Sequence, residues 1–484
     1  MMTHEAGGSP QDQQEWRPAK ILVAISSDLY VRNYLRTDAL EKLLAQNNCD
    51  IVADNDLALR DEVTNHPQFL THYSVNRNLE KRHNFLFNLM MWRHRKKSRT
   101  FFYRWVRNSQ WHRVDKSNGA SFFVRSFAIW LVAALRNPNG LRVPVLGNRI
   151  VFPIISPLLK MRLPVNKSLR RIVSEGNYDG IVFPSAAFDS VTVDLARLGK
   201  SFGVPTLCLI DNWDNLTSKT VFWVKPNFLG VWGQQAKDQA QFIHGFEPEN
   251  VHLIGTPRFD TYFLARRKSP PESHYPFPYI LFVGSAMPFD ELRALGELEK
   301  AMTESAAIPN SLKIVYRPHP WQQKRISKSN FQASDFSRTV LDIQLASAYA
   351  EGIKPETTNP GFQPDLHYYP SLLQNSRLVT GPLTTMLFEA ALCLRPVVAL
   401  AYDDGIHHTT SLKYFSHFDG AAKIPGFFFC ESESALGASL EKAVSNDSIP
   451  EDISTIATEY FLFHSKRGYA ERLASLANEI FSRR

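Results

Sequence analysis

The sequence predicts an α/β protein with two doubly wound, mostly parallel sheets that face each other across a cleft. Short apolar runs rich in β-branched residues alternate with amphipathic helical segments along most of the chain. This alternation is typical of βαβ units. One stretch rich in Pro, Ser and charge, 259–278, interrupts it. Such a composition predicts a linker between two domains.

The first run of alternation predicts an amino-terminal, Rossmann-like domain over 17–258. The preceding tail, 1–16, contains acids, Gly and Pro and is expected to be disordered. The predicted strands of this domain cover 19–26, 49–53, 178–186, 204–211, 227–233 and 250–255. Its predicted helices cover 32–46, 166–176, 188–203 and 234–245.

The second run of alternation predicts another Rossmann-like domain over 279–452. Its predicted strands cover 279–285, 312–320, 377–381 and 395–404, and its predicted helices cover 290–305, 384–394 and 432–445. The chain is expected to end in a long helical segment over 453–484. In open α/β sheets, ligands bind beyond the carboxyl ends of the strands, so the candidate site residues are sought there.

Residues 60–165 break the alternation of the first domain and are interpreted as a basic insertion. Between Lys81 and Ser174 the chain carries 20 Lys and Arg and one acid, which is +19 within a total charge of +8. Two apolar patches, 126–135 and 150–159, are too short to span a bilayer, which needs about 20 apolar residues.

The basic and aromatic residues of this insertion predict a surface that lies on an anionic membrane. Arg95, Lys96, Lys97 and Arg99 are expected to face the headgroups. One alternative is a solvated basic helix beside ordinary core segments. Nucleic acid is the other, and no recognisable binding motif accompanies the charge, so we expect no nucleic-acid partner.

Cysteine usage and the amino terminus indicate a reducing compartment. Cys49, Cys208, Cys393 and Cys430 are far apart and form no C-x-x-C pair, which argues against a disulfide framework or a zinc site. The first residues lack the basic start and apolar core of a signal peptide. We therefore expect a cytoplasmic protein, peripheral on the inner face of the membrane.

Two carboxylates, two amides and an indole follow the predicted strand 204–211 in the stretch "DNWDN", Asp211 to Asn215. A tight turn needs one Asp or Asn, so this concentration predicts a function at the edge of the sheet where ligands bind. Asp28 lies after the first strand and is a further carboxylate of that kind. The alternative is a capped loop in which Asn215 or Thr217 starts a helix.

Three polar clusters follow strands of the second domain. In "FVGSAMPFDE", Gly284 and Ser285 would let backbone approach a phosphate, although most such loops are only turns. In "YRPHP", two prolines stiffen a loop that carries Arg317 and His319. An Arg fork suits phosphate oxygens, and a His can protonate a leaving group near neutral pH. The alternative is that both meet local carboxylates.

The third cluster is "VTGPLTTMLFEAALCL". Gly381 permits a turn, and Thr384 and Thr385 fall near a helix N-terminus, where free N–H groups favour an anion. Glu389 lies about one turn further on, where a carboxylate could bind a ribose diol. The alternative is a Thr-capped helix with a surface Glu.

Together these clusters resemble the nucleotide-sugar half of GT-B glycosyltransferases. The nearest likeness is to the bacterial CDP-glycerol glycerophosphotransferase-like and surface-polysaccharide group. "RPHP" is similar to the His-Pro motif of bacterial sialyl- and Kdo-transferases, and "VHLIGTPRFD" to a stretch in this superfamily and in UDP-GlcNAc 2-epimerases. The likeness covers roughly 180–480. The loop "SSDLYVRNY" lacks the usual Gly-rich turn, and 60–165 matches nothing we can place.

The resemblance implies roles for the second domain. Arg317 and His319 would take the donor diphosphate, Thr384 and Thr385 would hold phosphate, and Glu389 would hold the ribose. It implies catalysis without a bound metal or other cofactor, the nucleotide-activated donor being a substrate.

The resemblance implies a glycosyltransferase that moves a sugar, or a polyol phosphate, to a cell-surface glycan or its lipid-linked precursor. Asp214 is the preferred base, Asp211 the loop-ordering carboxylate and Asp28 the spare. Trp213 would stack on a sugar or pack under its loop. The rival hypotheses are a nucleotide-sugar epimerase or hydrolase on the same fold, and a non-catalytic scaffold of a polysaccharide assembly complex.

Overall fold

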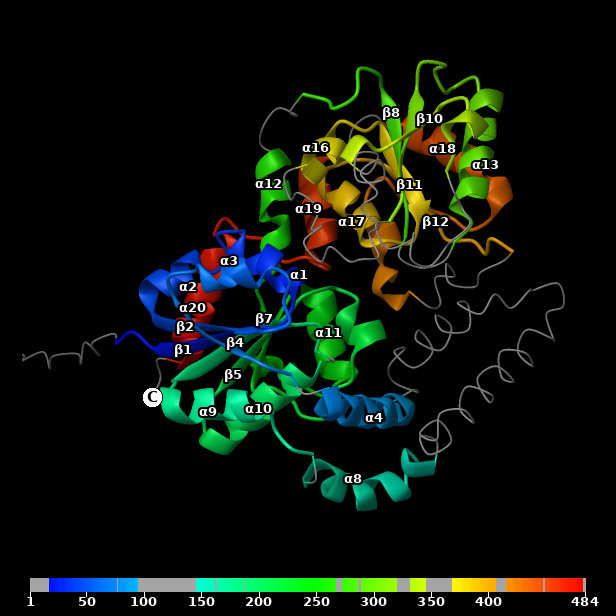
Figure 1. The fold of residues 1–484 in the computed structure, drawn as a ribbon. Coiled ribbons are helices and arrows are strands. Elements are labelled where there is room, and N and C mark those ends of the chain that lie inside the picture. The colour runs from blue at the N-terminus through cyan, green and yellow to red at the C-terminus, as the bar shows by residue number, and fades with distance from the viewer. Residues whose placement is uncertain are drawn as a thin grey trace, which may run out of the picture.

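The computed structural model describes most of the two predicted domains. The described residues are 17–75, 77–94, 145–161, 163–187, 189–266, 272–285, 289–319, 331–344, 368–405, 415–446 and 449–481. Arg95, Lys96, Lys97 and Arg99 lie outside them, and so does the expected tail 1–16. Within the described part, two sheets of seven and six strands form two domains, one above the other in Figure 1.

The first sheet has the strand order β3-β2-β1-β4-β5-β6-β7, and every neighbouring pair is parallel. Its strands are β1 (Lys20–Ile25), β2 (Asn48–Asp54), β3 (Phe69–Tyr73), β4 (Gly180–Ser185), β5 (Thr206–Ile210), β6 (Phe228–Val231) and β7 (Val251–Leu253). The central strands are buried on both faces, as a sheet covered by helices on both sides requires.

Helices cover this sheet, and η4 (Pro257–Phe259) with α12 (Asp260–Arg266) leads from it to the second domain. The helices are α1 (Asp28–Tyr30), α2 (Glu41–Gln46), α3 (Arg60–Thr64), α4 (Arg77–His94), α8 (Val151–Met161), α9 (Lys167–Gly176), α10 (Ser190–Phe202), α11 (Gln234–Phe242) and α12 (Asp260–Arg266). Among the described residues, this domain also has two π-helical turns, η1 (Val31–Leu35) and η2 (Asn215–Lys219), and the 3-10 turns η3 (Pro248–Asn250) and η4 (Pro257–Phe259).

The second sheet is also parallel throughout, with the order β10-β9-β8-β11-β12-β13. Its strands are β8 (Tyr279–Val283), β9 (Lys313–Arg317), β10 (Thr339–Leu341), β11 (Leu378–Pro382), β12 (Val397–Leu400) and β13 (Phe427–Cys430). Its helices are α13 (Glu291–Glu304), α16 (Tyr368–Gln374), α17 (Thr385–Leu392), α18 (Leu436–Val444) and α19 (Glu451–Glu459). In the described part of this domain, four 3-10 turns lie among them: η5 (Ala333–Asp335), η8 (Ser416–Phe418), η9 (Ala421–Lys423) and η10 (Glu433–Ala435).

The structure corrects several predicted elements. Strand β3 lies within 60–165, so that stretch begins as part of the first sheet. β10 and β13 were not predicted, because each is short and half-buried. The predicted helix 32–46 is a π-helical turn, a break and then α2.

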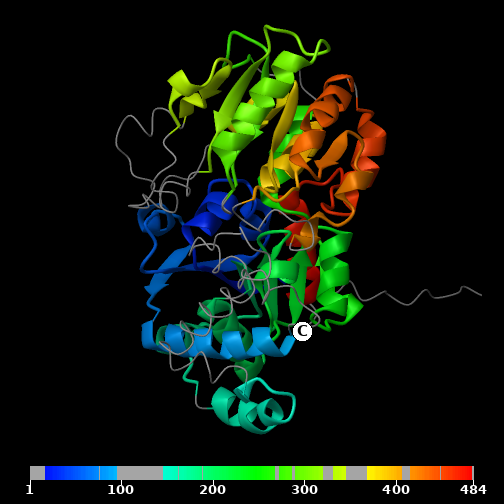
Figure 2. The same ribbon diagram turned by 90° about the vertical axis from the view of Figure 1, so that its right-hand side faces the viewer.

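The carboxyl-terminal segment is two helices joined by a non-helical stretch, and it connects the domains. α19 packs beside α17 of the second domain, whereas α20 (Tyr469–Phe481) packs against α2 of the first. Figure 2 shows this last, red stretch entering the lower domain. Tyr469, Leu473 and Phe481 of α20 join the apolar core under β1 and β2. The end of the chain therefore completes the fold of its beginning.

Candidate functional site at the domain junction

The three predicted clusters of the second domain meet at one edge of its sheet. β9, β8 and β11 are neighbours, and all three are parallel, so their carboxyl ends lie side by side. Gly284 N donates to the carbonyl of Arg317 at 2.8 Å, which ties the first two loops together. A Cβ on Gly284 would lie 2.7 Å from His319 N and 2.7 Å from a Glu291 carboxylate oxygen. Close approach of the half-buried His319 loop therefore requires glycine here.

Glycine is also required at Gly381, for a different reason. Its φ is +149°, and a Cβ would lie 2.1 Å from the carbonyl oxygen of Val283 in β8. Ser285 follows β8 and is buried; its N donates to Glu291 Oε1 at 2.9 Å. The backbone of β8 and β11 is thus packed tightly under the third cluster.

Arg317 is buried at this edge with unused hydrogen-bonding capacity. Its guanidinium lies over the ring of Tyr369 and donates to that hydroxyl, and Nη1 lies 3.9 Å from Met386 Sδ. A thioether is a weak acceptor. Among the described residues, Nε has no hydrogen-bond partner and the guanidinium no carboxylate partner. A buried guanidinium with an unused N–H donor is well suited to bind an anion.

Thr384 and Thr385 begin α17 as predicted. Thr384 is the N-cap residue, and its side chain makes no capping hydrogen bond. Thr385 Oγ1 accepts from Trp213 Nε1 of the first domain at 3.3 Å. The start of α17 therefore faces the loop that follows β5.

Glu389 is fully buried, and both of its carboxylate oxygens have partners. Arg258 Nη2 pairs with Oε1, and the Tyr262 hydroxyl donates to Oε2 at 2.6 Å. Both partners belong to the connection between the domains, η4 and α12. The surface-Glu alternative is therefore wrong, and the expected contact with a ribose stays a prediction. Glu389 instead joins the second domain to the end of the first.

Asp211 is buried at the end of β5. Asn33 Nδ2 of η1 donates to its Oδ1 at 3.0 Å. Burial raises the pKa of Asp211 above its usual range, and the Asn33 bond and the charges of Arg32 and Arg258 oppose that rise. A carboxyl with a raised pKa in a dry site is the kind of group that can exchange a proton.

Arg32, which the sequence reasoning missed, stands beside Asp211. It is buried, and its Nε donates to Asn33 Oδ1 at 2.9 Å. Within the described residues this is its one hydrogen bond, and no carboxylate lies within ion-pair distance. Burial, and then the nearby charge of Arg258, lower the pKa of Arg32 to about 10. The signal available in the sequence was an Arg in "SSDLYVRNY", the loop that follows the first strand.

Asp214, the preferred base, is paired. Its Oδ2 lies 2.8 Å from Lys219 Nζ at the other end of η2. Asn215 is buried and starts this π-helical turn, as the capped-loop alternative expected. Asp28 is the first residue of α1, and its Oδ1 accepts a hydrogen bond from Leu59 N at 2.8 Å. Both carboxylates therefore have structural partners.

Trp213 is packed under its loop and is unavailable to a sugar, which corrects the acceptor role expected for it. The indole stacks on Phe388 with ring centroids 5.0 Å apart. Phe418 and Phe461 meet it edge-on at 4.9 and 5.9 Å. Trp213 belongs to the first domain and the other three to the second or to the segment after it, so this cluster closes the junction at that point.

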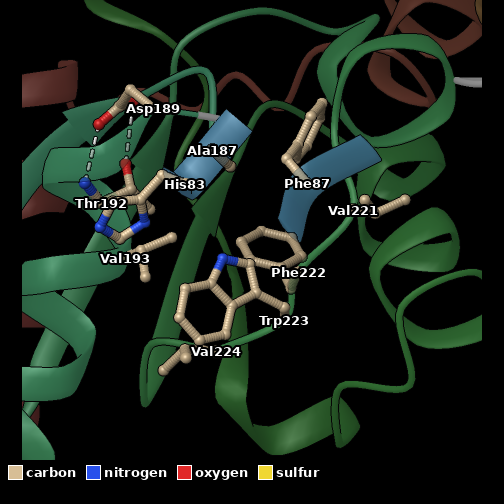
Figure 3. Close-up of a pocket in the computed structure, with 10 residues that line it drawn as sticks. All are labelled: His83, Phe87, Ala187, Asp189, Thr192, Val193, Val221, Phe222, Trp223 and Val224. Atoms are coloured by element: carbon tan, nitrogen blue, oxygen red, sulfur yellow. Dashed lines mark hydrogen bonds between the residues drawn. The ribbon is translucent and has the colours of Figure 1, made fainter. Parts of the chain in front are cut away.

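A small cavity lies elsewhere, between α4 and α10 of the first domain (Figure 3). Its lining includes His83, Asp189, Thr192 and Trp223. Asp189 accepts from the backbone and hydroxyl of Thr192 and so caps α10. None of the predicted site residues lines this cavity. Among the described residues, no group of three or more His, Cys, Asp or Glu could hold a metal ion.

Comparisons with known proteins give the fold. No protein-family model matches the chain, and no curated protein matches its sequence. Among solved structures, a UDP-GlcNAc 2-epimerase from Methanocaldococcus jannaschii superposes with a TM-score of 0.50 at 10% identity, over 95% of this chain and 99% of that one. A lipopolysaccharide outer core galactosyltransferase gives 0.45 at 9% identity, with 95% and 99% covered. An Anabaena protein solved with UDP and glucose gives 0.44 at 11%, with 95% and 100% covered.

At such identities a likeness shows the fold alone. Two parallel sheets, each covered by helices, and a connection between them through η4 and α12 agree with it. The chain therefore has the GT-B fold of two Rossmann-like domains, which it shares with the UDP-GlcNAc 2-epimerase structure.

Proposed function

We propose that the protein is a glycosyltransferase whose second domain binds a nucleotide-activated donor at the carboxyl ends of β8, β9 and β11. The carrying observation is Arg317, a buried guanidinium with a spare Nε beside a glycine loop and a helix N-terminus. The guanidinium and the helix N-terminus are two sources of positive potential at one edge of a sheet, and Gly284 lets the backbone of the neighbouring loops approach closely there. A diphosphate supplies the matching charge.

The proposed reaction transfers a sugar, or a polyol phosphate, to a cell-surface glycan or its lipid-linked precursor. For a sugar, the acceptor oxygen forms a bond to the anomeric carbon while the bond from that carbon to the diphosphate oxygen breaks. The electron pair of the broken bond stays on the diphosphate, where Arg317 and His319 stabilise it. A carboxylate takes the proton of the acceptor hydroxyl. The site would need no metal for this step, since the cations are side chains.

Asp211 suits the role of base better than Asp214, which reverses the expectation from the sequence. Asp214 already pairs with Lys219 at 2.8 Å, so its carboxylate is engaged within its own loop. Asp211 is buried with a raised pKa and lies near Arg32 and Arg258 at the junction. A raised pKa brings a carboxylate closer to the affinity that general-base catalysis needs.

Donor binding tests the proposal. Calorimetry with CDP-, UDP-, GDP-, CMP- and dTDP-linked donors should find one nucleotide that binds, and Arg317→Gln should weaken it by at least tenfold. Lys313→Gln is the matched control, because Lys313 is an exposed cation at the opposite end of the same strand. Absence of binding by every nucleotide would refute the proposal and favour a non-catalytic scaffold.

A nucleotide-sugar epimerase or hydrolase is the second candidate. The raised pKa of Asp211 favours it equally, since a carboxyl group of that kind can also move a proton at carbon or activate water. The two candidates differ in what they need. The protein is incubated with the donor in the absence of an acceptor, and the sugar is followed by NMR. A transferase should leave the sugar of the donor unchanged. An epimerised or freed sugar would establish the second candidate instead.

We also propose that the enzyme works at an anionic membrane surface in the cytoplasm, where a lipid-linked acceptor would be met. The charge of +19 between Lys81 and Ser174 supports this. Among the described residues, no helix combines the length and the apolar character that crossing a membrane requires. The proposed contact is therefore one of charge and of interfacial side chains.

A further inference from the structure

Among the residues of α8 whose side chains the structure describes, every exposed one is apolar. Ile150, just before the helix, and Ile154, Leu158 and Met161 are 76%, 69%, 51% and 74% exposed. Their spacing of four, four and three residues places them on one side of a helix. Pro153 and Pro157 are exposed on the same side. A helix on the surface of a soluble protein normally presents polar residues there.

The other face of α8 is used in the fold, so the exposure is not a sign of a misplaced helix. Phe152 is buried in a cluster with Leu86, Met90 and Trp223. The guanidinium of Arg93, at the end of α4, lies 5.0 Å from the centre of the Phe152 ring. These contacts hold one side of α8 toward the first domain and leave the stripe 150–161 facing outward. In Figures 1 and 2, α8 lies at the end of the molecule farthest from the second domain.

We propose that this stripe inserts into the interfacial region of an anionic bilayer and anchors the first domain there. Charge complementarity selects the partner, because the stripe lies within the stretch 81–174 that carries 20 cations and one acid. Arg149 is exposed immediately before it. A helix of 11 residues is about 16 Å long and cannot cross a bilayer of about 30 Å, so it lies in the membrane plane.

A second copy of the chain fits this face less well. Pairing two such faces would bring two segments of charge +19 together, and that repulsion opposes association. An anionic bilayer neutralises the same charge. The inference rests on the proposed membrane partner, and it does not depend on the transfer reaction.

The test is a double variant, Ile154→Asn with Leu158→Asn, in the full chain. Binding is measured by flotation with vesicles of phosphatidylcholine containing about one-third phosphatidylglycerol. Losing two inserted aliphatic side chains should lower the partition coefficient by roughly 10- to 100-fold. The difference should persist near 1 M salt, where exposed charges are largely screened.

The matched control is Ile453→Asn with Ile456→Asn on α19. These side chains are 52% and 71% exposed, and the first turn of their helix is acidic rather than basic. The control should bind vesicles within about twofold of the unchanged protein. Ile150→Asn with Met161→Asn provides a second variant of the stripe and should reproduce the loss.

Three results would overturn the inference: unchanged vesicle binding in both stripe variants, equal loss in the control, or a dimer that the stripe variants dissociate while vesicle binding persists. Donor calorimetry on the same proteins separates this from the proposed function. Nucleotide binding that survives in the stripe variants leaves the site at the junction in place whatever the vesicles show.

Discussion

Glu389→Gln distinguishes a residue that holds the domains together from one that holds a ribose. The substitution keeps the size of the side chain and leaves an acceptor for the Tyr262 hydroxyl, but it removes the charge that faces Arg258. Removing one partner of a buried ion pair costs about 3–5 kcal/mol, because the other charge stays buried. The Arg258 side chain is 20% exposed, so water still partly solvates its charge. We therefore expect the lower end, about 3 kcal/mol.

The assay is urea unfolding, followed by tryptophan fluorescence, with the double-mutant cycle through Arg258→Met. The coupling between the two positions should account for most of the loss. Glu433→Gln is the matched control, since Glu433 pairs with the exposed Arg293, and it should cost less than about 1 kcal/mol. A variant at Glu389 with unchanged stability and weakened donor binding would refute this reasoning and return the residue to the ribose.

Three further predictions concern the same junction. Asp211→Asn should lower kcat/KM by at least 100-fold, with a melting temperature close to that of the unchanged protein. The unchanged enzyme should lose activity as pH falls through the raised pKa of Asp211, because the base becomes protonated. A similar loss of activity in Asp214→Asn alone would assign the base to Asp214 instead. Trp213→Ala should cost about 3–5 kcal/mol, and Trp213→Phe, which keeps the stacking but loses the bond from Nε1, about 1 kcal/mol by urea unfolding. Burial lowers the pKa of His417 to about 4, so the unfolded chain binds the proton at a higher pH than the folded protein does. Stability should therefore fall as pH drops from about 6.5 to 4. His417→Gln should flatten this pH dependence, and an unchanged dependence would contradict the assignment to His417.

Much of the fold could be predicted from the sequence. The strands of both domains that were predicted have continuous apolar runs, because parallel strands covered on both faces are hydrophobic throughout. The strands that were missed, β3, β10 and β13, lie at sheet edges and have half-buried residues. Their pattern is therefore weak, and only pairing with a neighbour identifies them.

The positions of the second-domain clusters were predictable for the same reason. Gly284, Arg317 and Gly381 each lie at or next to the carboxyl end of a strand. Parallel strands bring such ends to one edge, so this could be predicted without any knowledge of side-chain contacts. The need for glycine at these positions was also predictable, because a Gly at the end of a strand indicates close approach of another backbone. The structure supplied the atoms that make the approach close, His319 N and the Val283 carbonyl.

The kind of residue at each strand end follows from the amino-acid order alone, whereas the folded chain sets which charges face each other. Asp211 and Asp214 are three residues apart in one loop, yet the first meets Asn33 and the second Lys219. Glu389 meets Arg258, which is 131 positions away, and Trp213 fills an apolar cluster of the other domain. Burial and charge pairing depend on distance in space, and distances across a domain junction are not encoded in any local pattern.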